Sequence, residues 1–223
     1  LGVHDVMIIC HPLRLIFIKT KKVAGTSFEI AVSKFCGPDC VITPISAPDE
    51  QLRQSLGFRG PQNYLDKGNG GAPIFFNHMT SSQVCEQVGL NLWMDYVKVA
   101  IVRNPFDVAI SRYYWEGGSN LGLTFLEYVK KNASHIAENS RIAPLEGKYK
   151  LDAYCRYEYL KSDLAAIGAE NVWEVLSSIR AKANVRPGNT DMSFVYSKYP
   201  EAISIVAAMA APEIEAFGYR PYA

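Results

Sequence analysis

Several features are scarce or absent in this chain of 223 residues, and each absence excludes a class of protein. No run of about eighteen apolar residues occurs, so we expect no transmembrane helix. The first residues lack the charged segment that opens a signal peptide, so we expect none there. Basic and acidic side chains nearly balance, at 23 and 22, which argues against general binding to nucleic acid or to membrane surfaces.

Cysteine is also sparse. The five cysteines are odd in number and scattered, which suits a reducing compartment better than a disulfide framework, so we expect a cytoplasmic protein. Cys36 and Cys40 are close enough in the sequence to close a small disulfide or to supply two metal ligands. Because no matching pair of His or Cys residues is evident, we interpret the cysteines as structural and expect no metal. The five are Cys10, Cys36, Cys40, Cys85 and Cys155.

The order of the predicted elements is typical of an α/β protein. Apolar runs at residues 15–18, 73–76 and 96–102 indicate buried strands, and a helical pattern follows each of them. Strands that alternate with helices form parallel βαβ units. We therefore expect a single domain over residues 1–223, with a three-layer α/β/α fold around a mainly parallel sheet.

Residues 15–27 carry the first candidate site, where an apolar run leads through a lysine-rich turn into a helix. A helix N-terminus of this kind binds anions, because its first N–H groups lack partners and its dipole favours negative charge. The P-loop consensus GxxxxGK[ST] does not fit, because here the lysines precede the glycine. An ordinary turn with solvated lysines is the alternative. The turn contains Lys19, Lys21, Lys22, Ala24, Gly25, Thr26 and Ser27.

A second candidate anion site follows the strand at residues 96–102. Arg103 comes directly after this strand, at the carboxyl end where ligands bind in open α/β sheets. Ser111 lies eight residues later, about two helical turns on. A guanidinium and a hydroxyl can hold one phosphate from two sides. The alternative is an arginine that covers the sheet end and a serine buried in a helix.

These two stretches resemble the sulfotransferases. The family's 5′-phosphosulfate loop is commonly written PKTGGTS, and its lysine corresponds to Lys22, while a lysine and Val-Ala replace its proline and Thr-Gly. Arg103-Asn-Pro with Ser111 is similar to the family's 3′-phosphate loop, which has the same spacing. The common order of the two motifs identifies the chain as a member of this family, and further stretches agree with its carbohydrate-type branch.

Three later segments agree with this resemblance. Residues 151–160, with Asp163 after them, are similar to the family's RYExL segment, and residues 213–219 are similar to its C-terminal ending. Arg186 and Gly188 resemble the Arg-x-Gly of the late loop that covers the 3′-phosphate in the cytosolic branch.

The resemblance implies a P-loop NTPase-like sulfotransferase fold and an enzyme whose donor is 3′-phosphoadenosine 5′-phosphosulfate, without a metal. Lys22 would neutralise the charge that builds on the leaving phosphate oxygen, although Lys19 and Lys21 remain alternatives for contact with the sulfuryl group. The implied donor-binding residues are Lys22, Ala24, Gly25, Thr26 and Ser27 at the 5′ end, and Arg103, Ser111, Arg186 and Gly188 at the 3′ end.

An acceptor hydroxyl needs a general base, and His78 is our candidate. It follows the predicted strand at residues 73–76, and an imidazole titrates near neutral pH. The family's base is commonly a histidine in this region. Glu29, one turn into the first helix, is the reserve base, and a purely structural histidine is the alternative.

The sequence does not identify the acceptor. Near-zero net charge favours a small carbohydrate or another metabolite over a long polyanion, and we expect the irregular segment at residues 40–72 to shape its pocket. A P-loop-type kinase and a non-catalytic nucleotide-binding protein with this fold are the competing hypotheses. The kinase is disfavoured because Arg103 stands where a kinase strand leads to a magnesium-binding aspartate.

Overall fold

The computed structural model of the chain describes residues 7–66, 68, 70–76, 78–179, 186–188 and 190–222. The chain divides into two compact units. The first consists of Leu1–Val102 and Ile142–Ala181, and the second of Arg103–Arg141 and Lys182–Ala223. That both units belong to one domain over residues 1–223 stays a prediction.

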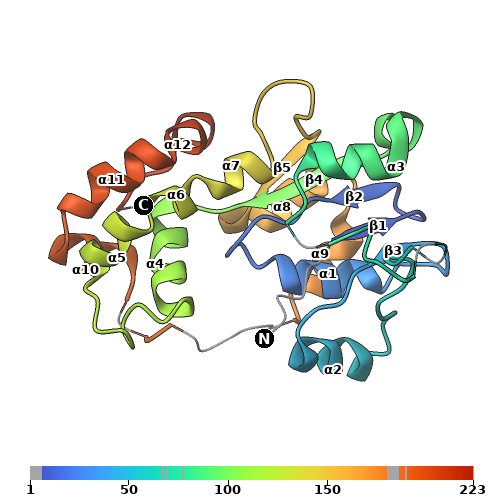
Figure 1. The fold of residues 1–223 in the computed structure, drawn as a ribbon, viewed down its shortest axis with the longest axis horizontal. Coiled ribbons are helices and arrows are strands. Elements are labelled where there is room, and N and C mark those ends of the chain that lie inside the picture. Colours follow the sequence, from blue (N-terminus) through green and yellow to red (C-terminus); the bar gives the residue numbers. More distant parts are fainter. Residues whose placement is uncertain are drawn as a thin grey trace. The chain divides into compact units, whose positions relative to one another are not determined.

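The first unit is built on a five-stranded sheet in the order β3-β1-β2-β4-β5 (Figure 1). β2 pairs with β4 and β4 with β5 in parallel, whereas β1 is antiparallel to both β2 and β3. β1 therefore runs against the other four described strands, and the sheet is mixed. The strands are β1 (Ile8–Cys10), β2 (Leu15–Phe17), β3 (Val41–Ile42), β4 (Val97–Val102) and β5 (Ala153–Arg156).

The α/β class is confirmed, but the expectation of a mainly parallel sheet holds only for part of it. The segment 73–76, predicted as a strand, lies outside the five-stranded sheet. Pro73 instead forms an isolated bridge with Leu65, and the Ile74 N–H donates to the carbonyl of Tyr64 at 2.9 Å. Because proline has no N–H to donate to a ladder, this segment pairs with its sequence neighbours rather than with a central strand.

Helices flank both faces of the sheet. On one face Phe17 contacts Phe28 of α1, with ring centroids 4.5 Å apart. The preceding residue, Ile16, lies in an apolar cluster with Val84 and Trp93 of α3. Successive strand residues point to opposite faces, so α1 and α3 cover opposite faces (Figure 1). The helices of this unit are α1 (Gly25–Ser33), α2 (Ala47–Ser55), α3 (Ser81–Asp95), α8 (Leu160–Ala166) and α9 (Glu170–Leu176), with a 3₁₀ turn η1 (Tyr157–Tyr159).

Local signals account for where these helices begin. A capping box precedes α3: Thr80 Oγ1 accepts from the Gln83 N–H, and Gln83 Oε1 accepts from the Thr80 N–H. The helix runs to Asp95, with a break at Gly89, where φ is 77°.

The second unit is helical. Tyr196 is fully buried in its apolar core, where it packs edge-on against Phe106 and Phe125, and its hydroxyl donates to the Phe106 carbonyl at 3.0 Å. This bond fixes the first turn of α4. The helices are α4 (Pro105–Trp115), α5 (Phe125–Lys131), α6 (Ala133–Ile136), α10 (Met192–Lys198), α11 (Glu201–Met209) and α12 (Ala211–Phe217), with α7 (Glu138–Ile142) at the unit boundary. None of the helices in the described part of the chain is long and apolar enough to cross a membrane.

Candidate functional site

The loop between β2 and α1 has the strand, turn and helix that its sequence predicts. Lys22 and Ala24 have positive φ values of 63° and 65°, and α1 begins directly afterwards. A left-handed backbone costs a non-glycine residue about 1–2 kcal/mol. Glycine adopts it readily, and the sulfotransferase loop has glycine at the position of Ala24. The departure from that consensus therefore keeps the loop conformation at some cost in strain.

The start of α1 supplies the donors of an anion site. Gly25, Thr26 and Ser27 form its first turn, where backbone N–H groups have no carbonyl partner within the helix. Both hydroxyl residues are largely buried. A Cβ at Gly25 would lie 2.9 Å from Cγ of Lys19, so glycine lets this turn sit close to the lysine stem. The arrangement has the N–H groups and the close backbone approach that phosphate binding requires.

Lys19 is the lysine that points inward. Its Nζ lies 2.8 Å from Oε2 of Glu29 and 3.3 Å from Oγ1 of Thr26. The exposed fractions of the Lys19 and Glu29 side chains are 7% and 1%, so the ion pair is buried. Lys21 and Lys22 are only half-buried. Lys19 therefore compensates the charge of the reserve base Glu29, a pairing that the sequence analysis missed.

His78 lies beside this loop. Its Nδ1 is 2.8 Å from the carbonyl oxygen of Lys19, which is 59 positions earlier in the chain. A carbonyl oxygen only accepts, so Nδ1 carries the hydrogen and Nε2 is the proton acceptor of the neutral ring. Since residues 73–76 are not a strand of the sheet, this hydrogen bond accounts for the position of His78.

Backbone strain gathers in the same region. In the described part of the chain, five non-glycine residues have positive φ, and three of them are Lys22, Ala24 and His78. Such strained conformations are retained where the surrounding structure holds them, and they cluster at functional sites. The strained residues therefore make the β2–α1 loop, together with His78, a candidate functional site.

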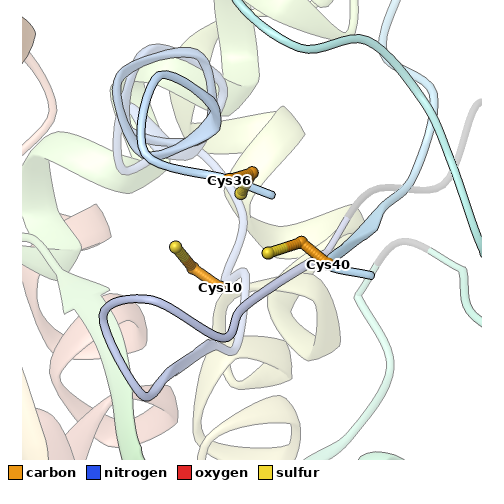
Figure 2. Close-up of side chains that lie close together, drawn as sticks. All are labelled: Cys10, Cys36 and Cys40. Carbon is orange, nitrogen blue, oxygen red and sulfur yellow. The ribbon is translucent and has the colours of Figure 1, made fainter. Parts of the chain in front are cut away.

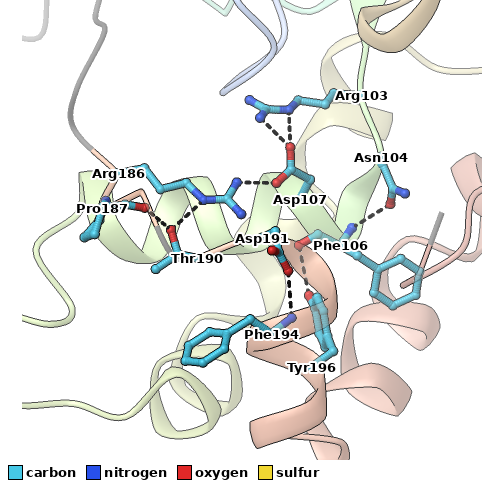
Figure 3. Close-up of polar contacts among 10 residues, drawn as sticks. All are labelled: Arg103, Asn104, Phe106, Asp107, Arg186, Pro187, Thr190, Asp191, Phe194 and Tyr196. Carbon is cyan, nitrogen blue, oxygen red and sulfur yellow. Dashed lines mark hydrogen bonds and ion pairs between the residues drawn. The ribbon is translucent and has the colours of Figure 1, made fainter.

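The second unit contains a cluster of two guanidinium groups around one carboxylate (Figure 3). Arg103 Nε donates to Oδ2 of Asp107 at 2.8 Å, and its Nη2 contacts the same oxygen. Arg186 pairs with the other oxygen, Oδ1, through Nη1. Two guanidinium groups therefore share one carboxylate. Asp107 was missed by the sequence analysis, although its spacing from Arg103 is the i,i+4 signal of a helical ion pair.

The loop that carries Arg186 is held by a hydroxyl. Arg186 Nε donates to Oγ1 of Thr190 at 3.0 Å, and that hydroxyl donates to the Pro187 carbonyl at 2.6 Å. Gly188 is exposed, and a Cβ there would meet no described atom within 4 Å. Asp107 therefore links Arg186 to Arg103. No packing contact within the described residues requires a glycine at position 188.

Ser111 lies on the same helix face as Asp107, one turn further along α4. The two residues are four positions apart, which makes them neighbours on a helix surface. Ser111 is half-buried. The N-terminus of α4 is fixed by Asn104, whose Oδ1 accepts from the Phe106 N–H and whose Nδ2 donates to the Arg220 carbonyl. Arg103, Asp107 and Ser111 therefore occupy one rigid stretch of chain.

The segment that resembles RYExL contains a bidentate ion pair between Arg156 at the end of β5 and Asp163 of α8, here called the Arg156–Asp163 fork. Arg156 donates from Nε and Nη2 to the two carboxylate oxygens of Asp163, at 2.9 and 2.8 Å, and its backbone N–H also donates to Oδ2. The hydrogen bond from the Arg156 side chain holds the pKa of Asp163 below its usual value. The fork ties the last strand to the helix that follows it, so its role within the first unit is structural.

The predicted site residues thus fall into two groups. The β2–α1 loop and His78 belong to the first unit, and Arg103, Ser111, Arg186 and Gly188 belong to the second. No family model matches the chain, and no curated protein matches it significantly. The resemblance to sulfotransferases therefore depends on the two motifs and their local structure.

Proposed function

We propose that this protein is a sulfotransferase that transfers a sulfuryl group from 3′-phosphoadenosine 5′-phosphosulfate to an acceptor hydroxyl on a carbohydrate or another small metabolite. The proposal includes the P-loop NTPase-like sulfotransferase fold. Its support comes from two anion-binding groups in the chain order of that family, each on a loop that continues into a helix N-terminus.

The observation that carries the proposal is the contact of His78 with the Lys19 carbonyl. It orients a histidine beside the loop that resembles the 5′-phosphosulfate loop, with Nε2 as the proton acceptor. A protein that only bound a nucleotide would have no need of a base at this position. The contact therefore favours an enzyme over a binding module.

The chemistry follows from these roles. The acceptor oxygen attacks the sulfur atom and its proton passes to Nε2 of His78. The bond between sulfur and the 5′-phosphate oxygen breaks, and adenosine 3′,5′-bisphosphate leaves with the electron pair. Lys22 and the N–H groups of the first turn of α1 neutralise the charge on the leaving oxygen, which makes catalysis mainly a matter of position and electrostatics.

The 3′-phosphate is assigned to the arginine cluster of the second unit. A phosphate would compete with the Asp107 carboxylate for Arg103 and Arg186, because guanidinium groups form charge-assisted hydrogen bonds with phosphate oxygens as they do with carboxylates. The same ion pairs weaken the kinase alternative, because both oxygens of Asp107 are engaged by guanidinium groups instead of standing open for magnesium.

Thermal unfolding with added ligand tests the proposal. Adenosine 3′,5′-bisphosphate should stabilise the protein by about 2.7 kcal/mol at a concentration of about 100 times its Kd. ATP with magnesium should stabilise it much less. Arg103→Ala should remove most of the effect of the bisphosphate. Arg141→Ala is the matched control, because that arginine lies in the same unit and its side chain is 73% exposed.

Two outcomes would point elsewhere. A clear preference for ATP with magnesium would favour a kinase. Binding of the bisphosphate without transfer of labelled sulfate to any of a broad set of sugars, lipid-linked sugars and phenols would favour a non-catalytic nucleotide-binding protein.

A further inference from the structure

Three cysteines from distant parts of the sequence converge in the first unit. Cys10 ends β1, Cys36 follows α1, and Cys40 directly precedes β3. Their three Sγ atoms lie within 4.8 Å of one another, and Figure 2 shows the three side chains close together. Sequence analysis found only the Cys36 and Cys40 pair, because Cys10 joins them through the fold.

The sheet accounts for the position of two of these thiols. In the antiparallel pairing of β1 with β3, Ile8 lies opposite Ile42 and Ile9 opposite Val41. Continuing this register by one residue brings Cys10 opposite Cys40. Both are fully buried, and Cys36 is 8% exposed. The sulfur atoms are therefore fixed by a strand pair and by the end of a helix, with little access for water.

The loop from Cys36 to Cys40 accepts hydrogen bonds from the irregular segment at residues 40–72, which we expected to shape an acceptor pocket. Gln62 Nε2 donates to the carbonyls of Gly37 and Cys40, both at 2.8 Å. Asn63 Nδ2 donates to the Cys40 carbonyl at 3.0 Å, and Arg59 Nε donates to the Cys36 carbonyl at 3.0 Å. These bonds organise the cysteine loop in advance of any ligand.

The cluster also accepts hydrogen bonds from the backbone. Cys40 Sγ accepts two backbone hydrogen bonds, from the N–H of His11 at 3.3 Å and from that of Gly37 at 3.2 Å. The Cys36 thiol donates to the carbonyl of Val32, 3.6 Å away.

The number of ligands restricts which ion fits. Soft thiolate ligands select Cu(I), zinc and iron–sulfur clusters. Zinc and iron–sulfur sites almost always use four protein ligands when structural. Within the described residues, no fourth His, Cys, Asp or Glu joins the three cysteines. The nearby His11 ring is engaged through Nδ1 with the Tyr96 hydroxyl and through Nε2 with the Asp39 carbonyl.

We propose that Cys10, Cys36 and Cys40 form a three-coordinate thiolate site for one Cu(I) ion. Bonds of about 2.3 Å to three sulfurs in a plane would place the sulfurs about 4.0 Å apart, slightly closer than the 4.8 Å within which they lie. Each thiol gives up its proton to solvent when it binds the metal, so copper affinity rises with pH. The site is independent of the sulfotransferase proposal.

The test is a titration of the reduced, full-length chain with Cu(I) under anaerobic conditions, in competition with a chromophoric Cu(I) chelator. We expect one Cu(I) per chain. Cys10→Ser, Cys36→Ser and Cys40→Ser should each weaken binding by more than about 100-fold. Loss of a residue that only supports a metal ligand typically weakens metal binding by at most about 100-fold. Cys85→Ser is the matched control, because Cys85 is also buried but lies on α3, outside the cluster, and it should bind like the wild type.

A second measurement does not depend on the folding of the variants. The X-ray absorption spectrum of the copper-loaded wild type should show three sulfur neighbours and no nitrogen or oxygen neighbour. Failure to bind Cu(I), or equal binding by the three serine variants, would overturn the proposal. So would a preference for zinc in a four-coordinate site, or a disulfide between two of the three cysteines in protein isolated without reductant.

Discussion

The ammonium group of Lys19 lies 2.8 Å from the carboxylate of Glu29, and both side chains are buried beneath the β2–α1 loop. The pair sits under the residues that resemble the 5′-phosphosulfate loop. Lys19, the lysine nearest to the strand, therefore has a structural role.

Removal of one partner of this pair should therefore destabilise the fold. Lys19→Met leaves the Glu29 carboxylate buried without its cation, which typically costs about 3–5 kcal/mol. The double variant Lys19→Met/Glu29→Gln should lose much less than the sum of the two single variants. Urea unfolding at pH 7 measures this, with Lys21→Met as the control from the same loop. A Lys19→Met variant as stable as the wild type would exclude the structural role.

Lys22→Ala should reduce turnover more than donor affinity. Its charge matters most when the leaving oxygen becomes anionic, so the loss is expected in the transition state. Removal of one such group typically costs about 10²–10³ in rate. Single-turnover transfer with saturating donor gives the rate, and calorimetry gives the affinity. Lys21→Ala should be milder, and a larger effect for Lys21 than for Lys22 would shift the catalytic role to Lys21.

Arg103→Ala should weaken binding of adenosine 3′,5′-bisphosphate by about 1.5–3 kcal/mol, the usual value of a charge-assisted hydrogen bond. Ser111→Ala should cost about 1 kcal/mol, because a hydroxyl makes a neutral hydrogen bond. Isothermal calorimetry on each variant, with Arg141→Ala as the control, decides this. Wild-type affinity for Arg103→Ala would remove that residue from the site.

His78→Ala should leave the fold and the bisphosphate affinity nearly unchanged, while turnover falls by about 10²–10⁴. The wild-type rate should also fall at acidic pH, because a protonated imidazole no longer accepts the hydroxyl proton. Glu29→Gln serves as the comparison, with its rate corrected for the folded fraction. A small effect of His78→Ala beside a collapse in Glu29→Gln would move the base to Glu29.

The Arg156–Asp163 fork should make stability depend on pH. Its hydrogen bonds hold the pKa of Asp163 below the unfolded value of about 3.9, so the carboxylate stabilises the fold above that pH and loses this effect as pH falls. Asp163→Asn should cost about 1 kcal/mol near pH 7 and progressively less below about pH 4. Unfolding curves over this range provide the measurement. Asp95→Asn, at an ion pair more than half exposed, should show a smaller change.

Local structure followed from local sequence. The Thr80 capping box, the Asn104 cap with its proline, and the turn before Gly25 are each complete within a few neighbouring residues, and the turn was predicted. β1 and β3, of three and two residues, were not recognised as strands. Their stability comes from pairing with each other and with β2, which no short window contains.

By itself, the sequence determined where the two anion-binding motifs begin, since a lysine-rich turn or an Arg-Asn-Pro before a helix carries its chemistry in adjacent residues. Only the tertiary structure decided which partners these residues meet. Lys19 is tied to His78, Asp107 joins Arg103 to Arg186, and Cys10 meets the Cys36–Cys40 loop. The physical reason is that such contacts depend on sheet register and helix packing, which bring together residues that no spacing rule relates.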